Sequence, residues 1–134
     1  VRPEWRIEGP RSRHAGFNAA KIFAGLDPLP TAAVCFSDLV ALGLMYGLAR
    51  EGLRPGIDVA VIGYDDIDEA SIAMPSLTTV ANGQAEVGHR EAGALLDRLS
   101  GQPASDETVL IRPVLKVRAS SEHAHTSRRG QAAS

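Results

Sequence analysis

The order of apolar segments predicts an α/β domain in which helices cover both faces of a parallel sheet. Two continuous apolar runs, residues 31–36 and 58–63, are bounded by Pro, Gly and Asp, which is typical of strands buried in a parallel sheet. Segments with helical spacing of apolar residues lie between and after these runs, so strands and helices alternate. The 134 residues suit a single domain core.

The first two segments are predicted to form a strand and a helix. Residues 4–9 alternate in polarity, with Trp5 and Ile7 on one side, which favours a short strand that ends at a Gly-Pro pair. Apolar residues then recur at helical spacing over 15–26. The Asp27-Pro28 pair ends that pattern, because proline cannot continue a helix.

A helix over residues 39–49 is apolar on nearly every side. One of its faces can pack on the sheet, and the rest must meet another surface. We therefore expect this helix to form part of a subunit interface. Gly52 is a suitable residue for its C-terminal cap.

The second half of the chain shows further alternation. The predicted elements are a short helix over 67–73 that stops at Met74-Pro75, an extended segment over 77–80, a helix over 84–100 and an edge strand over 109–118 around Pro113. The last residues are polar and small, so the chain divides into a folded part, 1–120, and a disordered tail, 121–134.

Composition excludes several classes of protein. The 14 Lys and Arg residues against 16 Asp and Glu residues give a net charge of −2, which is no footprint for nucleic-acid binding. No apolar stretch approaches the roughly 20 residues of a membrane helix, and the N-terminus has no apolar signal region. The missing initiator Met indicates that the sequence begins inside a longer protein or after a cleavage. A single cysteine fits a reducing, cytoplasmic compartment.

Polar residues follow both buried strands, at the edge where open α/β sheets bind ligands. Asp65 and Asp66 come after the second strand, and a carboxylate there can accept hydrogen bonds from ligand hydroxyls, hold a metal, transfer a proton or cap the next helix. Ser37 comes after the first strand and either donates to a ligand or caps the following helix. Asp38 is interpreted as a structural cap.

The remaining reactive side chains carry no predicted role. His14 and His89 stand alone on helices, and His123 and His125 lie in the tail. Cys35 lies within a buried strand, where an inert core position is the preferred interpretation. No nucleophile elbow, zinc-protease pair, phosphate loop or dinucleotide loop is present, so we expect no catalytic residue, metal or cofactor.

Five motifs in order resemble the lactose/galactose repressor family. They are Pro30-Thr31-Ala32, Ser37-Asp38-Leu39-Val40-Ala41-Leu42-Gly43, Gly52-Leu53-Arg54-Pro55, Asp58-Val59-Ala60-Val61-Ile62-Gly63-Tyr64-Asp65-Asp66 and Pro75-Ser76-Leu77-Thr78-Thr79-Val80. The resemblance extends over about residues 8–120. It implies a partial type I periplasmic-binding-protein-like domain, mostly its C-terminal lobe, in which the helix over 84–100 belongs to the other lobe.

The resemblance also implies roles for individual residues. Asp65 matches the position whose carboxylate binds effector hydroxyls, and Ser37 matches a cleft-lining position that is often Asn. Arg11 falls where an aromatic residue can stack on the effector, and its guanidinium could stack on a sugar, pair with an acidic effector or be a solvated surface group. The residues that match dimer contacts are Leu42, Met45, Tyr46, Ala49, Ile72 and Ala73.

The function that follows is the sensing of an effector, such as a sugar, by a cytoplasmic, homodimeric transcription regulator. Ligand-driven closure of the lobes would change the affinity of a helix-turn-helix region, absent from this chain, for operator DNA. A periplasmic sugar-binding protein of a transport system is the alternative, and a metal-dependent enzyme that uses Asp65 and Asp66 is a third hypothesis.

Overall fold

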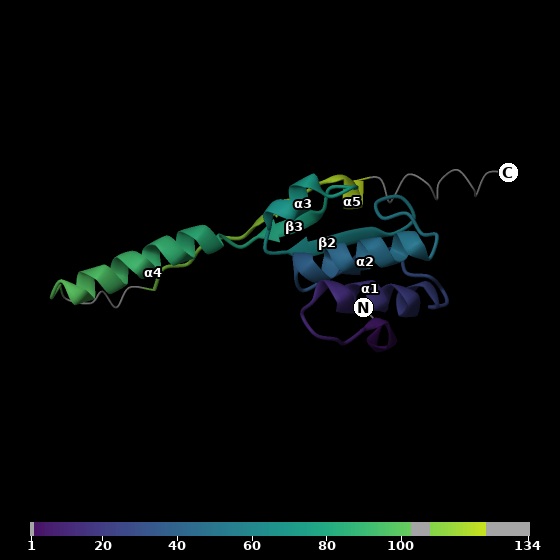
Figure 1. Ribbon diagram of the computed structural model, residues 1–134, viewed down its shortest axis with the longest axis horizontal. Helices are drawn as coiled ribbons and strands as arrows, with labels where there is room; N and C mark the ends of the chain where they lie inside the picture. Colours follow the sequence, from purple (N-terminus) through teal and green to yellow (C-terminus); the bar gives the residue numbers. More distant parts are fainter. Residues whose placement is uncertain (1, 103–107, 123–134) are drawn as a thin grey trace.

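The computed structural model describes residues 2–102 and 108–122, and these form a four-stranded sheet with flanking helices (Figure 1). The strand order is β1-β2-β3-β4, with β1 and β2 parallel, β2 and β3 parallel, and β4 antiparallel to β3. The mostly parallel sheet confirms the predicted α/β class. The strands are β1 (Ala32–Val34), β2 (Ala60–Tyr64), β3 (Thr78–Ala81) and β4 (Val114–Lys116).

Two helices pack against each other at unusually short range. These are α1 (Arg13–Ala24) and α2 (Asp38–Arg50), which lie side by side in Figure 1. A Cβ atom would lie 2.1 Å from a carbonyl oxygen of the facing helix at Gly16 and 1.9 Å from one at Gly43. Each glycine therefore allows the other helix's backbone to approach, and a larger residue has no room at either position.

The core lies between α2 and the sheet. Fully buried apolar side chains come from α2 and from the segments on and beside β2 and β3: Ala41, Leu42, Leu48, Val59, Val61 and Leu77. Packing of α1 on one side of α2 and of the sheet on another explains why that helix is apolar nearly all round. Because α1 covers part of this apolar surface, the apolar pattern alone does not require a subunit interface, which stays a prediction.

Three further helices complete the described chain, α3 (Asp68–Ile72), α4 (Gln84–Leu99) and α5 (Ala119–Glu122). In Figure 1, α3 and α5 lie on the opposite side of β2 from α2. Helix α4, drawn in green, extends away from the rest of the molecule, and none of its residues is buried. Its Leu95, Leu96 and Leu99 form an exposed apolar stripe, and α4 makes at most marginal contact with the other helices and strands of the described chain. No described helix has the length and apolarity that a membrane span requires.

Two strand predictions near the start of the chain need correction. The segment expected to be a strand over 4–9 instead begins with a short 3₁₀ helix, η1 (Pro3–Trp5), because Pro3 at its start favours helical φ and its carbonyl accepts a hydrogen bond from the Arg6 amide. Strand β1 was expected to be buried on both faces. It is an edge strand paired only with β2, and no described helix covers Val34, which is 80% exposed.

The predicted disordered tail also needs correction at its start. Ser121 and Glu122 belong to α5, which is held in place by Ser120. The Ser120 hydroxyl is buried, donates to the Val61 carbonyl at 2.6 Å and accepts from the Thr78 amide at 2.8 Å. Residues 123–134 of that prediction, with His123 and His125, lie outside the described residues.

Candidate functional site

Asp65 and Asp66 form a strained turn at the carboxyl end of β2. Their φ angles are +119° and +56°, and they are the non-glycine residues of the described chain with positive φ. Positive φ is disfavoured for residues with a Cβ atom, and such strain concentrates at functional sites. The Asp65 amide donates to the Val80 carbonyl at 3.0 Å, which fixes the turn against β3.

The Asp65 carboxylate is the meeting point of three segments of the chain. It accepts a hydrogen bond from the Arg11 guanidinium, which precedes α1, and forms an ion pair with it. It also accepts from Asn82 Nδ2 at 3.3 Å and from Gln84 Nε2 at 3.0 Å. The side chain of Asp65 is only 7% exposed, whereas that of Arg11 is 56% exposed. The Asp65 carboxylate is thus nearly buried, whereas its charged donor, Arg11, is largely exposed to solvent.

Asp66 belongs to a different network. Its carboxylate forms ion pairs with Lys116 Nζ at 3.0 Å and Arg118 Nη2 at 2.7 Å, so it ties the turn to β4 and the residues after it. Partial burial alone would raise the pKa of Asp66, but the hydrogen bonds and charges of Arg118 and Lys116 outweigh it and hold that pKa below its usual range. Since Asp65 and Asp66 face different partners, they do not form one acidic pair.

The third hypothesis, a metal-dependent enzyme, lacks a ligand set. Within residues 2–102 and 108–122, no three His, Cys, Asp or Glu side chains are grouped so as to hold a metal ion. His14 on α1 and His89 on α4 are exposed. Cys35 is buried, and its burial, with a smaller effect of the nearby Asp38 charge, raises the pKa of the thiol to about 12. The inert interpretation of Cys35 is consistent with that value.

Ser37 and Asp38 are buried residues that stabilise the site through hydrogen bonds to neighbouring segments. Ser37 is the N-cap of α2, since its Oγ accepts from the Val40 amide at 3.4 Å, and its side chain is fully buried. Asp38 lies in the first turn of α2, accepts from the Ile67 amide at 3.0 Å and from Thr79 Oγ1 at 2.6 Å, and is also fully buried. The structural role predicted for Asp38 is therefore present, although Ser37 and not Asp38 is the cap.

Gly63 allows Asp38 to reach this position. A Cβ atom on Gly63 would lie 2.1 Å from Asp38 Oδ1, so any other residue would displace the carboxylate. The buried Asp38 fixes the residues after Asp66 through the amide of Ile67 and fixes β3 through Thr79. It thereby positions the turn that carries Asp65 without contacting Asp65.

The sequence did not predict the contacts of Asn82 and Gln84 with Asp65, of Arg118 with Asp66, or of Arg13 with Glu69. Arg13 Nη2 pairs with Glu69 Oε1 at 2.9 Å, which joins the start of α1 to α3 beside the pair between Arg11 and Asp65. Asn82 lies between the extended segment predicted over 77–80 and the helix predicted over 84–100. In a parallel sheet, however, the residues after β3 meet those after β2 at one edge, and this rule could have placed Asn82 beside Asp65.

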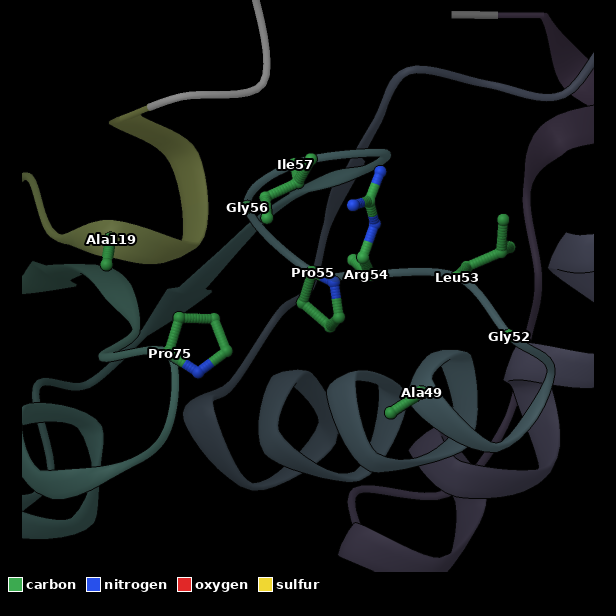
Figure 2. Close-up of a pocket in the computed structure, with 9 residues that line it drawn as sticks. All are labelled: Ala49, Gly52, Leu53, Arg54, Pro55, Gly56, Ile57, Pro75 and Ala119. Carbon is green, nitrogen blue, oxygen red and sulfur yellow. The ribbon is translucent and has the colours of Figure 1, made fainter. Parts of the chain in front are cut away.

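Two cavities lie apart from the Asp65 cluster. Figure 2 shows one of about 520 Å³ near the C-terminal end of α2 and the loop before β2, with Arg54, Pro75 and Ala119 among its lining residues. The other, of about 570 Å³, lies along the open edge of β1 and is lined by Trp5 and Phe36 among others. Neither is lined by Asp65, Arg11 or Ser37. The first cavity is at the opposite end of β2 from Asp65.

The residues predicted to form a dimer interface fall into two groups. Leu42 and Met45 are buried in the chain's own core, whereas Tyr46, Ala49 and Ile72 are exposed. Ala73 is partly buried and packs against the core. The exposed members lie on α2 and α3, and their role in a dimer stays a prediction.

Comparison with known proteins identifies the family. Residues 1–121 match the family model described as the periplasmic binding protein-like domain. The chain belongs to the periplasmic binding protein-like family. Among curated proteins, it is 32% identical over 120 residues to the HTH-type transcriptional repressor PurR of Mannheimia succiniciproducens. That alignment covers 90% of this chain and 36% of the repressor, so the chain spans about a third of the length of such relatives.

Solved structures agree with this assignment and confirm the resemblance to the lactose/galactose repressor family. A LacI family transcriptional regulator from Enterococcus faecium, solved with bound ribose, has a TM-score of 0.77 and 29% identity, over 83% of this chain and 40% of that one. A dimeric lac repressor with an 11-residue C-terminal deletion has a TM-score of 0.76 and 32% identity, over 87% and 42% respectively. These periplasmic binding protein-like relatives are transcription regulators and not enzymes.

Proposed function

We propose that this chain is most of the C-terminal lobe of the effector-binding domain of a DNA-binding transcriptional repressor. The proposal is supported by similarity to PurR and to LacI-type regulators over most of the chain. In this proposal the regulator is a cytoplasmic homodimer and not an enzyme. A helix-turn-helix region outside these residues reads the operator, since the net charge of −2 gives this chain no excess of positive charge for binding DNA.

The observation that carries the proposal is the environment of Asp65. A carboxylate that is 7% exposed, on a residue with φ of +119°, lies at the sheet edge where α/β folds bind ligands. The neighbouring Asn82 Oδ1 is buried and accepts no hydrogen bond from the described residues. An acceptor left in this state costs about 1–3 kcal/mol. Ligand hydroxyls that donate to Asp65 and Asn82 would remove that cost.

We infer that the effector is a small polyhydroxylated molecule. Carboxylate and amide oxygens accept hydrogen bonds from pairs of hydroxyls, and the regulator from Enterococcus faecium, which is similar in fold and sequence, holds ribose. Of the two other predicted ligand residues, Arg11 is in direct contact with Asp65. Ser37 is buried and engaged as a helix cap, which weighs against a direct contact with effector.

Coupling to DNA would pass through the segments that join the lobes. Asp65 contacts the end of β3 through Val80, the turn through Asn82 and the start of α4 through Gln84. A ligand that binds Asp65 therefore perturbs the connection between β3 and α4. If α4 packs in the other lobe, effector binding favours one arrangement of the lobes, by no more than its difference in affinity for the two.

The experiment that tests this function uses the intact protein. Genomic DNA fragments that bind it are selected, and their retention is then measured with and without a low-molecular-weight metabolite extract. The proposal expects sequence-specific DNA binding that the extract changes at least tenfold. A protein that selects no DNA, yet binds sugar, would support the transport alternative and would overturn the repressor assignment.

A further inference from the structure

We propose that the effector of this site is an anion that also carries hydroxyl groups, such as a sugar acid or a sugar phosphate. This inference rests on the proposed function and specifies its ligand class. It comes from the placement of Arg11. The Arg11 side chain is largely exposed, and its guanidinium pairs with the Asp65 carboxylate, which is proposed to bind the ligand.

The ion pair occupies the acceptor that a ligand needs. Asp65 already accepts from Arg11, Asn82 and Gln84. A neutral sugar can replace Arg11 only by exchanging a charged donor for a neutral one, and hydrogen bonds to charged donors are the stronger. It would also leave the guanidinium without its partner.

An anionic ligand also exchanges a charged donor at Asp65 for a neutral one, but unlike a neutral sugar it does not leave the guanidinium without a partner. Its carboxylate or phosphate gives Arg11 a new negatively charged partner in place of Asp65, while its hydroxyls replace the guanidinium at the Asp65 oxygens. Asp65 keeps the two neutral amide donors of Asn82 and Gln84 throughout. The number of ion pairs at the site is unchanged, because the pair between Arg11 and Asp65 becomes a pair between Arg11 and the ligand.

Arg11 is placed to make this exchange. Its side chain is 56% exposed, and its hydrogen bond to Asp65 is the one that the described residues show for it, so its other N–H donors can reach a ligand. Its backbone is fixed on both sides. The Ser12 amide donates to the Pro10 carbonyl at 2.8 Å, and Ser12 Oγ caps α1 by accepting from the Ala15 amide at 3.1 Å. The guanidinium therefore stays close to the site when it leaves Asp65.

The test determines whether the effector is an anion before its chemical identity is known. A metabolite extract that changes retention of the selected DNA is passed over an anion-exchange resin, and the retained and unretained fractions are assayed on the intact protein. Calorimetry with D-gluconate, D-glucose 6-phosphate and D-glucose provides defined probes, and phosphatase treatment of the retained fraction distinguishes phosphates from carboxylic acids. The variant is Arg11→Gln. The matched control is Arg54→Gln, which breaks another Arg–Asp pair, with Asp58, at the far end of β2.

The proposal expects the fraction retained on the resin to change DNA binding by the wild-type protein. The effect of that fraction should be tenfold to hundredfold weaker in Arg11→Gln and unchanged in Arg54→Gln. A response confined to the unretained fraction, or one in the retained fraction that Arg11→Gln leaves unchanged, would overturn the anionic class while the repressor function stands. If the unfractionated extract has no effect on DNA binding, the proposed function fails, and this inference fails with it.

Discussion

The Arg11 guanidinium donates a hydrogen bond to the Asp65 carboxylate, although 54 positions of sequence separate the two residues. The contact joins the residue before α1 to the turn after β2, and the pair between Arg13 and Glu69 lies beside it. Two ion pairs thus connect the start of α1 with the segment that follows β2. The candidate effector site is built on this connection, and the predictions below test the parts of the fold that support it.

The close packing of α1 on α2 predicts a strong effect of small substitutions. Gly43→Ala would place a methyl group 1.9 Å from a backbone oxygen, so the helices must separate. We expect a loss of about 1–3 kcal/mol in the free energy of unfolding, measured by urea titration of the intact protein. Gly25→Ala, at the exposed C-terminal cap of α1, where a Cβ atom would lie 3.6 Å from its nearest neighbours, is the control and should leave stability unchanged or raise it. Equal effects of the two substitutions would refute the packing argument.

The Asp66 network predicts a second stability effect. Asp66→Asn removes the charge between Lys116 and Arg118, and the side chains of Asp66 and Arg118 are only 17% and 18% exposed. We expect the free energy of unfolding to fall by about 1–3 kcal/mol at neutral pH. Asp68→Asn is the matched control, because Asp68 is exposed at the start of α3. A variant as stable as the wild type would show that these ion pairs contribute nothing.

Part of this site could be predicted from sequence. The alternation of strands and helices placed Asp65 and Asp66 at the carboxyl end of a buried strand, where the structure has them. Which cation faces which carboxylate could not be read in the same way. That depends on β4 returning antiparallel beside β3, which brings Lys116 opposite Thr79, and on the fold of α1, which brings Arg11 to Asp65.

The incorrect strand predictions have local causes. The alternation of Trp5 and Ile7 fits a strand, but it covers too few residues to outweigh the helical preference that Pro3 imposes at the start of the segment. The apolar run of β1 predicts burial on both faces. A pattern of side chains cannot say whether another element is available to cover them, and Val34 and Phe36 are exposed in the described chain.

Acid stability gives a prediction with a defined direction. Hydrogen bonds from the Arg54 side chain and amide lower the pKa of Asp58 from its usual 3.8 to about 2. Because the folded state holds this proton more weakly than the unfolded state, Asp58 stabilises the fold above pH about 4, and that contribution is lost as the pH falls toward 2. In Asp58→Asn, the fall in unfolding free energy over this range should be shallower, as measured by urea titration at each pH.

The control for the acid experiment is Asp97→Asn on α4, since Asp97 forms no ion pair within the described residues. It should leave the pH dependence of unfolding as in the wild type. The account of Asp58 is wrong if both variants, or neither, change the slope between pH 4 and pH 2.

The thiol of Cys35 should resist modification in the folded protein. Its burial raises its pKa to about 12, so almost no thiolate is present at pH 8. We expect Cys35 to react with a disulfide reagent at least a hundredfold more slowly in the native protein than in 6 M guanidinium chloride, the thiolate being the reacting form. Rapid reaction of Cys35 under native conditions would contradict its placement in the core beside β1.

The most direct test of the account is the response of operator binding to effector in Asp65→Asn. Asparagine tolerates the positive φ of this position, so the variant removes the charge and leaves the turn. DNA affinity of the intact protein is measured with and without the active metabolite fraction. The account predicts an unchanged affinity for DNA alone and at least a tenfold weaker response to the fraction. A full response in Asp65→Asn would contradict the claim that this carboxylate binds the effector.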